Sequence, residues 1–132
     1  MQKLKYLSSE WVQEAAKRLR ETLSAEQMKH VTSSMLTLYH GCPDGKQRSL
    51  FYRFADGFLA DLILQEGEPP RAEFVISGDY ETFARISRAE LGARSALMSG
   101  KLRLQGNMVK ALSLASVVDR LNRVLATIPT EF

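Results

Sequence analysis

The chain has 132 residues, of which 45% are hydrophobic and 25% charged, values typical of one globular domain, here spanning residues 1–132. Its one cysteine, Cys42, cannot form an internal disulfide, which excludes a small fold held together by disulfides. Residues 1–14 lack the apolar segment of a signal peptide, and no stretch approaches the roughly 18 apolar residues of a membrane span. We therefore expect a cytoplasmic protein.

The net charge of +3 is unevenly distributed along the chain. Between Arg85 and Arg123, eight basic residues stand against two acidic ones. This excess would attract an anionic membrane surface, or the phosphates of a nucleic acid bound through residues 85–123; the alternative is a solvated face that keeps the protein dissolved. Basic and aromatic residues are not interleaved on any one strand, as a single-strand platform requires, so we expect no nucleic-acid partner.

The first predicted element is an amphipathic helix over residues 10–23. Ser8 and Ser9 are residues that cap helix N-termini. Apolar side chains then recur every four positions, at Trp11, Ala15, Leu19 and Leu23. This spacing predicts that one face of the helix packs on a core.

Strands follow, because the hydrophobic period changes to two residues. We predict strands over residues 32–40, 48–55, 58–64 and 71–77. Asp56-Gly57 separates the second strand from the third and is a preferred pair for a two-residue hairpin turn. Four strands in succession predict an antiparallel meander.

Helices return after these strands. We predict a helix capped by Asp79, a short helix over residues 90–98, a fifth strand over 101–105 and a long final helix over 108–127, ended by Pro129. This order predicts an α+β fold, with a five-stranded, mostly antiparallel sheet and helices packed on one face.

The predicted hairpin of residues 48–64 carries apolar side chains on both faces. A two-residue turn places Phe51 on the same face as Leu62, and Tyr52 on the same face as Ile63. A sheet with one face in water does not have this pattern. The second apolar face must meet helices, a second subunit or a ligand. The final helix, apolar on more than one stripe, is then either simply buried or one wall of an apolar cavity.

Catalysis has little support in the sequence. His40 and Cys42 would lie on the same side of an extended segment, as a nucleophile and its base do. They stand beside a loop rich in turn residues, and no third group to orient them is apparent. Zinc-ligand spacing, phosphate-binding glycine loops and hydrolase motifs are absent. We predict no enzymatic activity, no catalytic residues, no metal and no cofactor.

Two segments resemble the sterol-carrier-protein family. Residues 74–83 (FVISGDYETF) have the strand that leads into an aspartate-capped helix with an inward-facing phenylalanine. Residues 97–107 (LMSGKLRLQGN) have the helix end in Ser-Gly-Lys-Leu, the alternating strand and the Gly-Asn turn. The resemblance is strongest over residues 71–114, while the order of the elements agrees over nearly the whole chain.

This resemblance implies a sterol-carrier-like fold with a hydrophobic tunnel between sheet and helices, which takes sterols, fatty acids or acyl-CoA. It also implies a stand-alone module of the bacterial type. The chain departs from the family pattern at Ala89, where the family often has glycine, and at Gly92-Ala93, where it often has Asp-Pro. We expect the turn there, and with it one cavity wall, to differ.

We conclude that the sequence predicts a non-enzymatic carrier of a lipid-like ligand, as a monomer or homodimer. An anionic membrane surface is a second expected partner, and a homodimeric interaction domain without ligand is the alternative. The cavity is expected between the sheet and the final helix, which acts as its lid. Its predicted lining consists of Phe74, Ile76, Phe83, Ile86, Leu97, Met98, Leu102, Leu104, Met108, Leu112, Ala115 and Val118.

Overall fold

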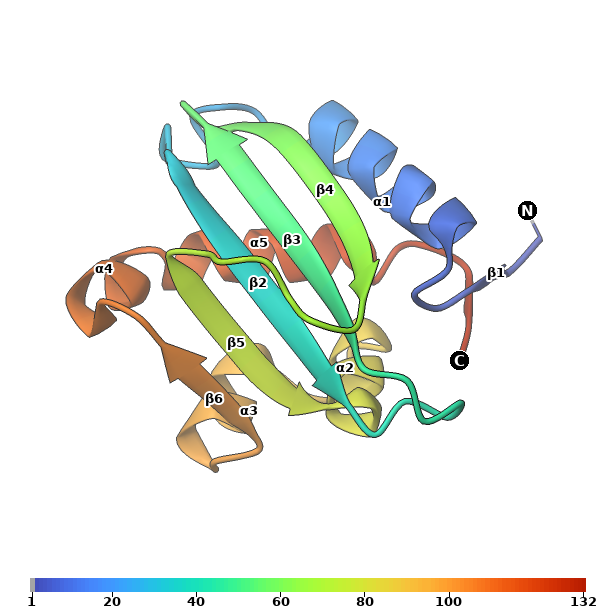
Figure 1. Ribbon diagram of the computed structural model, residues 1–132. Helices are drawn as coiled ribbons and strands as arrows, with labels where there is room; N and C mark the ends of the chain where they lie inside the picture. Colours follow the sequence, from blue (N-terminus) through green and yellow to red (C-terminus); the bar gives the residue numbers. More distant parts are fainter. Residues whose placement is uncertain (1) are drawn as a thin grey trace.

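A five-stranded sheet forms one layer of the molecule and helices form the other (Figure 1). The computed structural model describes residues 2–132, apart from the side chains of residues 112 and 113. The sheet has the order β4-β3-β2-β5-β6, which confirms the predicted α+β class and strand number. Its strands are β2 (Ser33–His40), β3 (Arg48–Ala55), β4 (Phe58–Glu66), β5 (Phe74–Asp79) and β6 (Leu102–Gln105).

The predicted meander is correct for three strands and wrong for the fourth. β2, β3 and β4 pair antiparallel in turn, but β5 lies on the other side of β2 and runs parallel to it. Residues 67–73 make this connection by crossing in front of β3 and β2 (Figure 1). Pro69 and Pro70 favour extended backbone, and an extended residue spans about 3.3 Å, so this short segment reaches across two strands.

A β-bulge between β3 and β4 changes which side chains share a face. The register shifts at Arg53 and Phe54, so Tyr52 lies opposite Leu62 and Phe51 opposite Ile63. The prediction that Phe51 shares a face with Leu62 is therefore wrong, because the extra residue of a bulge reverses the alternation beyond it. The helix-facing side gains the leucines of β4 from this reversal.

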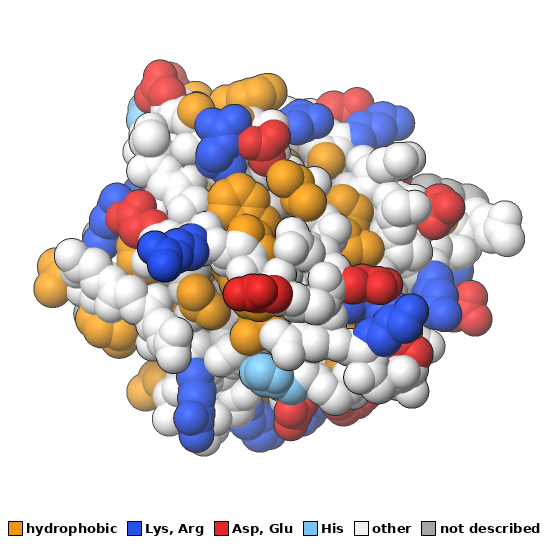
Figure 2. Space-filling model, viewed as in Figure 1, with side chains coloured by type: hydrophobic (Ala, Val, Ile, Leu, Met, Phe, Trp, Pro, Cys, Tyr) orange, Lys and Arg blue, Asp and Glu red, His pale blue; other side chains and the backbone are white. Residues whose placement is uncertain are grey.

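The other side of the sheet carries no helix. It receives the ion pair of Arg53 Nε with Asp61 Oδ2, at 2.6 Å, beside Phe51 and the half-exposed Ile63. Figure 2 looks onto this face and shows hydrophobic side chains over the middle of the sheet with acidic and basic side chains around them. The bulge thus makes this face mixed, where a regular hairpin would have made both faces largely apolar.

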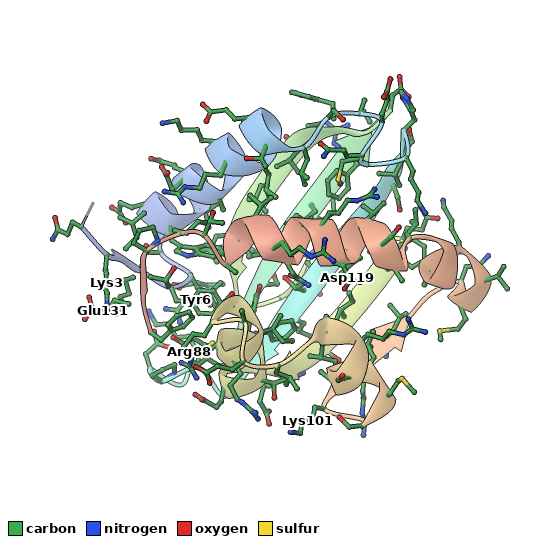
Figure 3. The ribbon with its side chains drawn as sticks, turned by 180° about the vertical axis from the view of Figure 1, so that it is seen from behind. Lys3, Tyr6, Arg88, Lys101, Asp119 and Glu131 are labelled. Atoms are coloured by element: carbon green, nitrogen blue, oxygen red, sulfur yellow. The ribbon has the colours of Figure 1, made fainter. Side chains whose placement is uncertain are left out.

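All the long helices cover one face of the sheet, as predicted. Figure 3, seen from the helix side, shows the last helix running across the strands between the first helix and the two middle ones. The N-cap predicted at Ser8 is present, since its Oγ accepts a hydrogen bond from the Trp11 amide at 3.2 Å. The helices are α1 (Ser9–Thr22), α2 (Tyr80–Ser87), α3 (Ala93–Met98), α4 (Met108–Ser113) and α5 (Ala115–Leu125).

The single final helix predicted over residues 108–127 is wrong, because the chain breaks at Leu114. Leu114 has φ −100° and ψ 4°, and its amide is shared between the carbonyls of Lys110 and Ala111, at 3.2 and 3.1 Å. This tightened turn separates α4 from α5. No proline or glycine stands there, so no local signal predicts the break. The break separates α4, which lies beyond the end of β6, from α5, which crosses the strands (Figure 1).

The two ends of the chain meet in a feature that the sequence did not predict. β1 (Leu4–Lys5) pairs parallel with β7 (Thr130–Glu131), and the Trp11 indole donates to Thr130 Oγ1 at 3.1 Å. This clasp holds Tyr6 in the core, 5% exposed. Among the described residues, none of the helices has the length and apolar character that spanning a bilayer requires.

Candidate functional site: an apolar cavity between sheet and helices

A cavity of about 550 Å³ lies between the helix-facing side of the sheet and the last three helices. Its floor comes from alternate residues of the strands, which point to one face. The floor includes Met35, Phe54, Phe74, Ile76, Leu102 and Leu104. Its roof includes Ala93, Leu97 and Met98 of α3 and Met108, Ala111, Ala115 and Val118 of α4 and α5. The space is thus enclosed almost entirely by hydrocarbon.

Close packing at Gly78 shapes one end of this space. A Cβ on Gly78 would lie 2.5 Å from Leu102 Cδ2 and 3.4 Å from Phe83 Cε2. The missing side chain therefore lets Leu102 of β6 and Phe83 of α2 approach each other over the strand. The cavity is therefore bounded by tightly packed side chains at the end near α2.

Nine of the twelve residues predicted for the lining lie around the cavity. Phe83 and Ile86 line a smaller pocket of about 40 Å³ that adjoins it toward α2. The side chain of Leu112 lies outside the described residues. The nine are Phe74, Ile76, Leu97, Met98, Leu102, Leu104, Met108, Ala115 and Val118.

The prediction missed the part of the wall that β2 and β3 supply. Met35 and Phe54 line the cavity because β5 pairs with β2 rather than continuing the meander. The alternation of β2 already separated Met35, Thr37 and Tyr39 from the leucines between them. Which of these two sets faced the helices depended on the pairing, and the sequence had not given the pairing correctly.

Two charged side chains interrupt the apolar lining. Arg94 on α3 and Asp119 on α5 both border the cavity, and Figure 3 shows Asp119 on the helix layer. Within the described part of the chain neither belongs to an ion pair. Arg94 is exposed, so a cation is available beside the cavity for a ligand's polar end.

An ion pair fastens α4 to the sheet at the cavity's edge. Lys110 Nζ lies 2.5 Å from Glu73 Oε1, and Ser33 Oγ donates to Glu73 Oε2 at 2.8 Å. Lys110 and Ser33 together lower the pKa of the Glu73 carboxyl. Because the pair is largely exposed, it contributes little to the stability of the fold. It positions α4 over Phe74, whose ring lies 5.9 Å from Lys110 Nζ.

The turn that departs from the family pattern adopts a glycine-like backbone. Ala89 has φ 60°, a left-handed conformation that glycine adopts more readily. Gly92, which follows, is the N-cap of α3. Alanine thus adopts a left-handed backbone in this turn, and Ala93 of the same stretch enters the cavity wall.

The His40 and Cys42 side chains lie in different surroundings. His40 is exposed, whereas Cys42 is 4% exposed with its Sγ directed at the Tyr39 carbonyl, 3.9 Å away. No hydrogen bond joins the two among the described residues. In the same part of the chain no three His, Cys, Asp or Glu side chains are grouped closely enough to hold a metal ion.

Hydrophobic side chains are exposed around the α3–α4 edge of the cavity. Met98 is 82% exposed, Met108 52% and Val109 80%. Met98 and Met108 also belong to the cavity lining, so the apolar interior and the apolar surface are continuous there. This edge is the mouth of the cavity.

A concave, largely apolar cavity of this size is typical of a site that binds a small molecule. The family comparison agrees: the model of the SCP-2 sterol transfer family matches residues 2–119. The chain therefore belongs to that family, whose members are lipid-binding and lipid-transfer domains. No curated protein sequence gives a significant match.

Solved structures share the fold at low sequence identity. A crystal structure of sterol carrier protein 2 superposes with a TM-score of 0.83 at 22% identity, covering 94% of this chain and 99% of that one. A Thermus thermophilus protein, described as possibly a sterol carrier protein, gives 0.79 at 22% identity, with coverage of 99% and 94%. A palmitated sterol carrier protein 2 like 2 from Aedes aegypti gives 0.57 at 21%, with coverage of 84% and 94%.

An alanine-to-leucine pair tests whether the cavity is empty space. Ala111 borders the cavity, and Ala15 of α1, 0% exposed, is packed in the core. We expect Ala15→Leu to lower the free energy of unfolding by about 1–3 kcal/mol through overpacking. Ala111→Leu should change it by less than about 1 kcal/mol, because its new carbons enter open volume. Urea unfolding measures both, and an equal loss in the two variants would show that the cavity is filled.

Proposed function

We propose that this chain is a non-enzymatic carrier that holds one lipid-like molecule in the cavity between the sheet and α3, α4 and α5. The observation that carries the proposal is an apolar space of about 550 Å³ in a chain of 132 residues. Interiors of this size ordinarily contain few voids larger than a water molecule. The volume lies in the range of about 300–1,000 Å³ found for ligand sites.

The ligand class that best fits this space is a sterol, a fatty acid or the acyl chain of an acyl-CoA. Family membership supports this class, and the Aedes aegypti relative of the same fold is described as palmitated. A long flexible chain would also suit walls that contain Met35, Met98 and Met108, because thioether side chains repack easily. Arg94, beside the cavity, would meet a carboxylate or phosphate at the polar end.

The described side chains support a role in binding a ligand without catalysis. The cavity lining is hydrocarbon apart from a few polar groups, and the thiol that could act as a nucleophile is buried outside it. A buried free thiol also suits the reducing cytoplasm, where we place the protein.

Uptake of a fatty acid tests the carrier function. We expect the protein to bind cis-parinaric acid with increased fluorescence and to release it when palmitate is added. Ala111→Phe should weaken uptake at least about tenfold, because the ring occupies ligand volume. Ala55→Phe makes the same change at an exposed position of β3 outside the cavity lining; it is the matched control and should bind as the parent does. A folded parent protein that takes up neither probe, and carries no lipid in native mass spectra, would contradict the proposal.

We further propose that the mouth of the cavity docks on an anionic membrane surface. Exposed Met98 and Val109 supply apolar contact there, and exposed Arg94, Lys101 and Arg103 supply positive charge. None of these three cations forms an ion pair with a described residue. The basic excess of residues 85–123 is not all available: Arg88 pairs with Glu81 and Glu90. Arg120 bonds to the Gln27 carbonyl, so the proposal rests on Arg94, Lys101 and Arg103 alone.

Charge reversal at this mouth tests the docking. Each basic residue near an anionic bilayer contributes about 1 kcal/mol, so Lys101→Glu should reduce co-sedimentation with phosphatidylserine-containing vesicles by about tenfold at low salt. Lys3→Glu makes the same charge change far from the mouth, as Figure 3 shows for the two labelled lysines, and should have little effect. Equal binding of the parent to neutral and anionic vesicles, or no weakening by salt, would rule the surface out.

A further inference from the structure

The cavity continues toward α2 into a pocket of different chemistry. This smaller space, about 40 Å³, shares walls with the main cavity, among them Met35, Leu97 and Leu121. It lies at the end opposite the mouth, beside the tightly packed contact over Gly78. A chain that filled the main cavity from the mouth would reach it last.

Polar groups converge on this inner pocket. The sheet contributes the hydroxyls of Thr37, Tyr39 and Tyr52, the segment before α1 contributes Tyr6, and the helices contribute Ser87 and Asn122. Burying so many hydroxyls in a core costs free energy unless each finds a partner. A core that needed only to be filled would hold phenylalanine and valine at these positions.

The hydroxyls form a chain of hydrogen bonds that still has a donor to spare. Thr37 Oγ1 and Tyr39 Oη are 2.9 Å apart, Tyr52 also bonds to Thr37, and Tyr6 bonds to Tyr39 and Ser87. These four hydrogen bonds use four of the five hydroxyl protons, so one proton and several lone pairs stay available. The Asn122 side chain makes no hydrogen bond to any described residue, so an amide from the roof also lies free. The pocket can therefore both donate to and accept from an incoming oxygen.

This pocket favours an uncharged partner. Burial raises the pKa of Tyr6, Tyr39 and Tyr52 above the usual range of a tyrosine, so all three stay protonated at neutral pH. None of the described residues that line the pocket is a lysine, an arginine or a histidine. A carboxylate here would be buried without a counter-ion, which is costly, whereas a hydroxyl or carbonyl would lose nothing but its hydrating water.

We propose that this inner pocket is a recognition subsite for an uncharged oxygen, a hydroxyl or a carbonyl, at the end of an otherwise apolar ligand. The proposal rests on the carrier function proposed above and deepens it. The ligand enters with its neutral polar end leading, its hydrocarbon fills the main cavity, and its other end lies near the mouth. A fatty acid would bind in the opposite sense, with its carboxylate near Arg94.

Matched ligands test the subsite. Hexadecan-1-ol and 1-fluorohexadecane have nearly the same shape, but fluorine does not donate and accepts poorly. Displacement of cis-parinaric acid should show the alcohol binding about tenfold more tightly. Thr37→Val and Tyr39→Phe, which remove hydroxyls at almost constant volume, should each reduce that preference at least threefold and leave the affinity for the fluoride unchanged. Tyr80→Phe, a tyrosine outside both lining sets, is the control and should keep the preference.

Each outcome of this experiment has a distinct meaning. No preference in the parent protein, or a preference that survives in Thr37→Val, would overturn the subsite while leaving the carrier function intact. Weakening of palmitate binding to the same extent by Thr37→Val would show that the pocket takes the carboxylate, and the assignment to an uncharged oxygen would be wrong. If the parent protein binds none of hexadecan-1-ol, 1-fluorohexadecane and palmitate, the carrier function itself is overturned. Should Tyr39→Phe fail to fold, the parent ratio and the isosteric Thr37→Val decide the question.

Discussion

The helix-facing side of the sheet must be kept from water, and the helices cover it unevenly. At the α1 end, Trp11, Ala15 and Leu19 pack directly on the sheet and are nearly inaccessible. Over β5 and β6, α4 and α5 diverge at Leu114 and leave a gap of about 550 Å³ above Phe74 and Ile76. Apolar surface that is shielded but not filled contributes less dispersion energy than a packed core. A bound molecule with its own hydrocarbon surface would supply the missing contacts.

The half of the sheet that α1 covers is closely packed, and it supports the half that lies under the cavity. The clasp of β1 with β7 and the buried face of α1 hold one half of the sheet firmly. α5 is anchored along this half through Leu121, Val124 and Leu125, all buried. Its first turn and α4 extend beyond that support, and the exposed pair of Glu73 and Lys110 fastens α4 to the sheet edge. Among the described side chains of α4, Met108 and Val109 are exposed and Lys110 and Ala111 half-buried, so this part of the helix layer is less well packed than α1.

The two ends of the cavity have opposite character, and together they define the ligand. The mouth is exposed, apolar and basic, suited to a bilayer surface and to a charged headgroup near Arg94. The inner end is buried, hydroxyl-rich and uncharged, and lies between Tyr39 of the sheet and Asn122 of α5. Under the two proposals above, a ligand would be selected by its length and by which of its ends is polar. Neither property depends on a reactive side chain.

Local chemistry in the sequence predicted most of the fold. Ser8 predicted the start of α1, Asp56-Gly57 predicted the hairpin turn, and the alternation of apolar residues predicted five strands. Each of these signals acts over only a few residues. Three features depend on contacts distant in sequence and were not predicted correctly: the parallel place of β5, the bulge at Arg53 and the break at Leu114. The first of these hid Met35, and with it the hydroxyls of β2, from the predicted site. The lining residues of α3, β6 and α4 were predicted because they are the apolar positions that remain after each element covers its neighbours.

The methionine methyl groups give the most direct measurement of where a lipid lies. Met35, Met98 and Met108 line the cavity from floor, middle helix and mouth, whereas Met28 lies in a separate small pocket under α1. In ¹³C-methyl-methionine NMR spectra, assigned by single Met→Leu substitutions, addition of palmitate or hexadecan-1-ol should shift Met35, Met98 and Met108 together and leave Met28 in place. Spectra in which Met35 does not move, or in which Met28 alone responds, would contradict a lipid site between this sheet and its last helices.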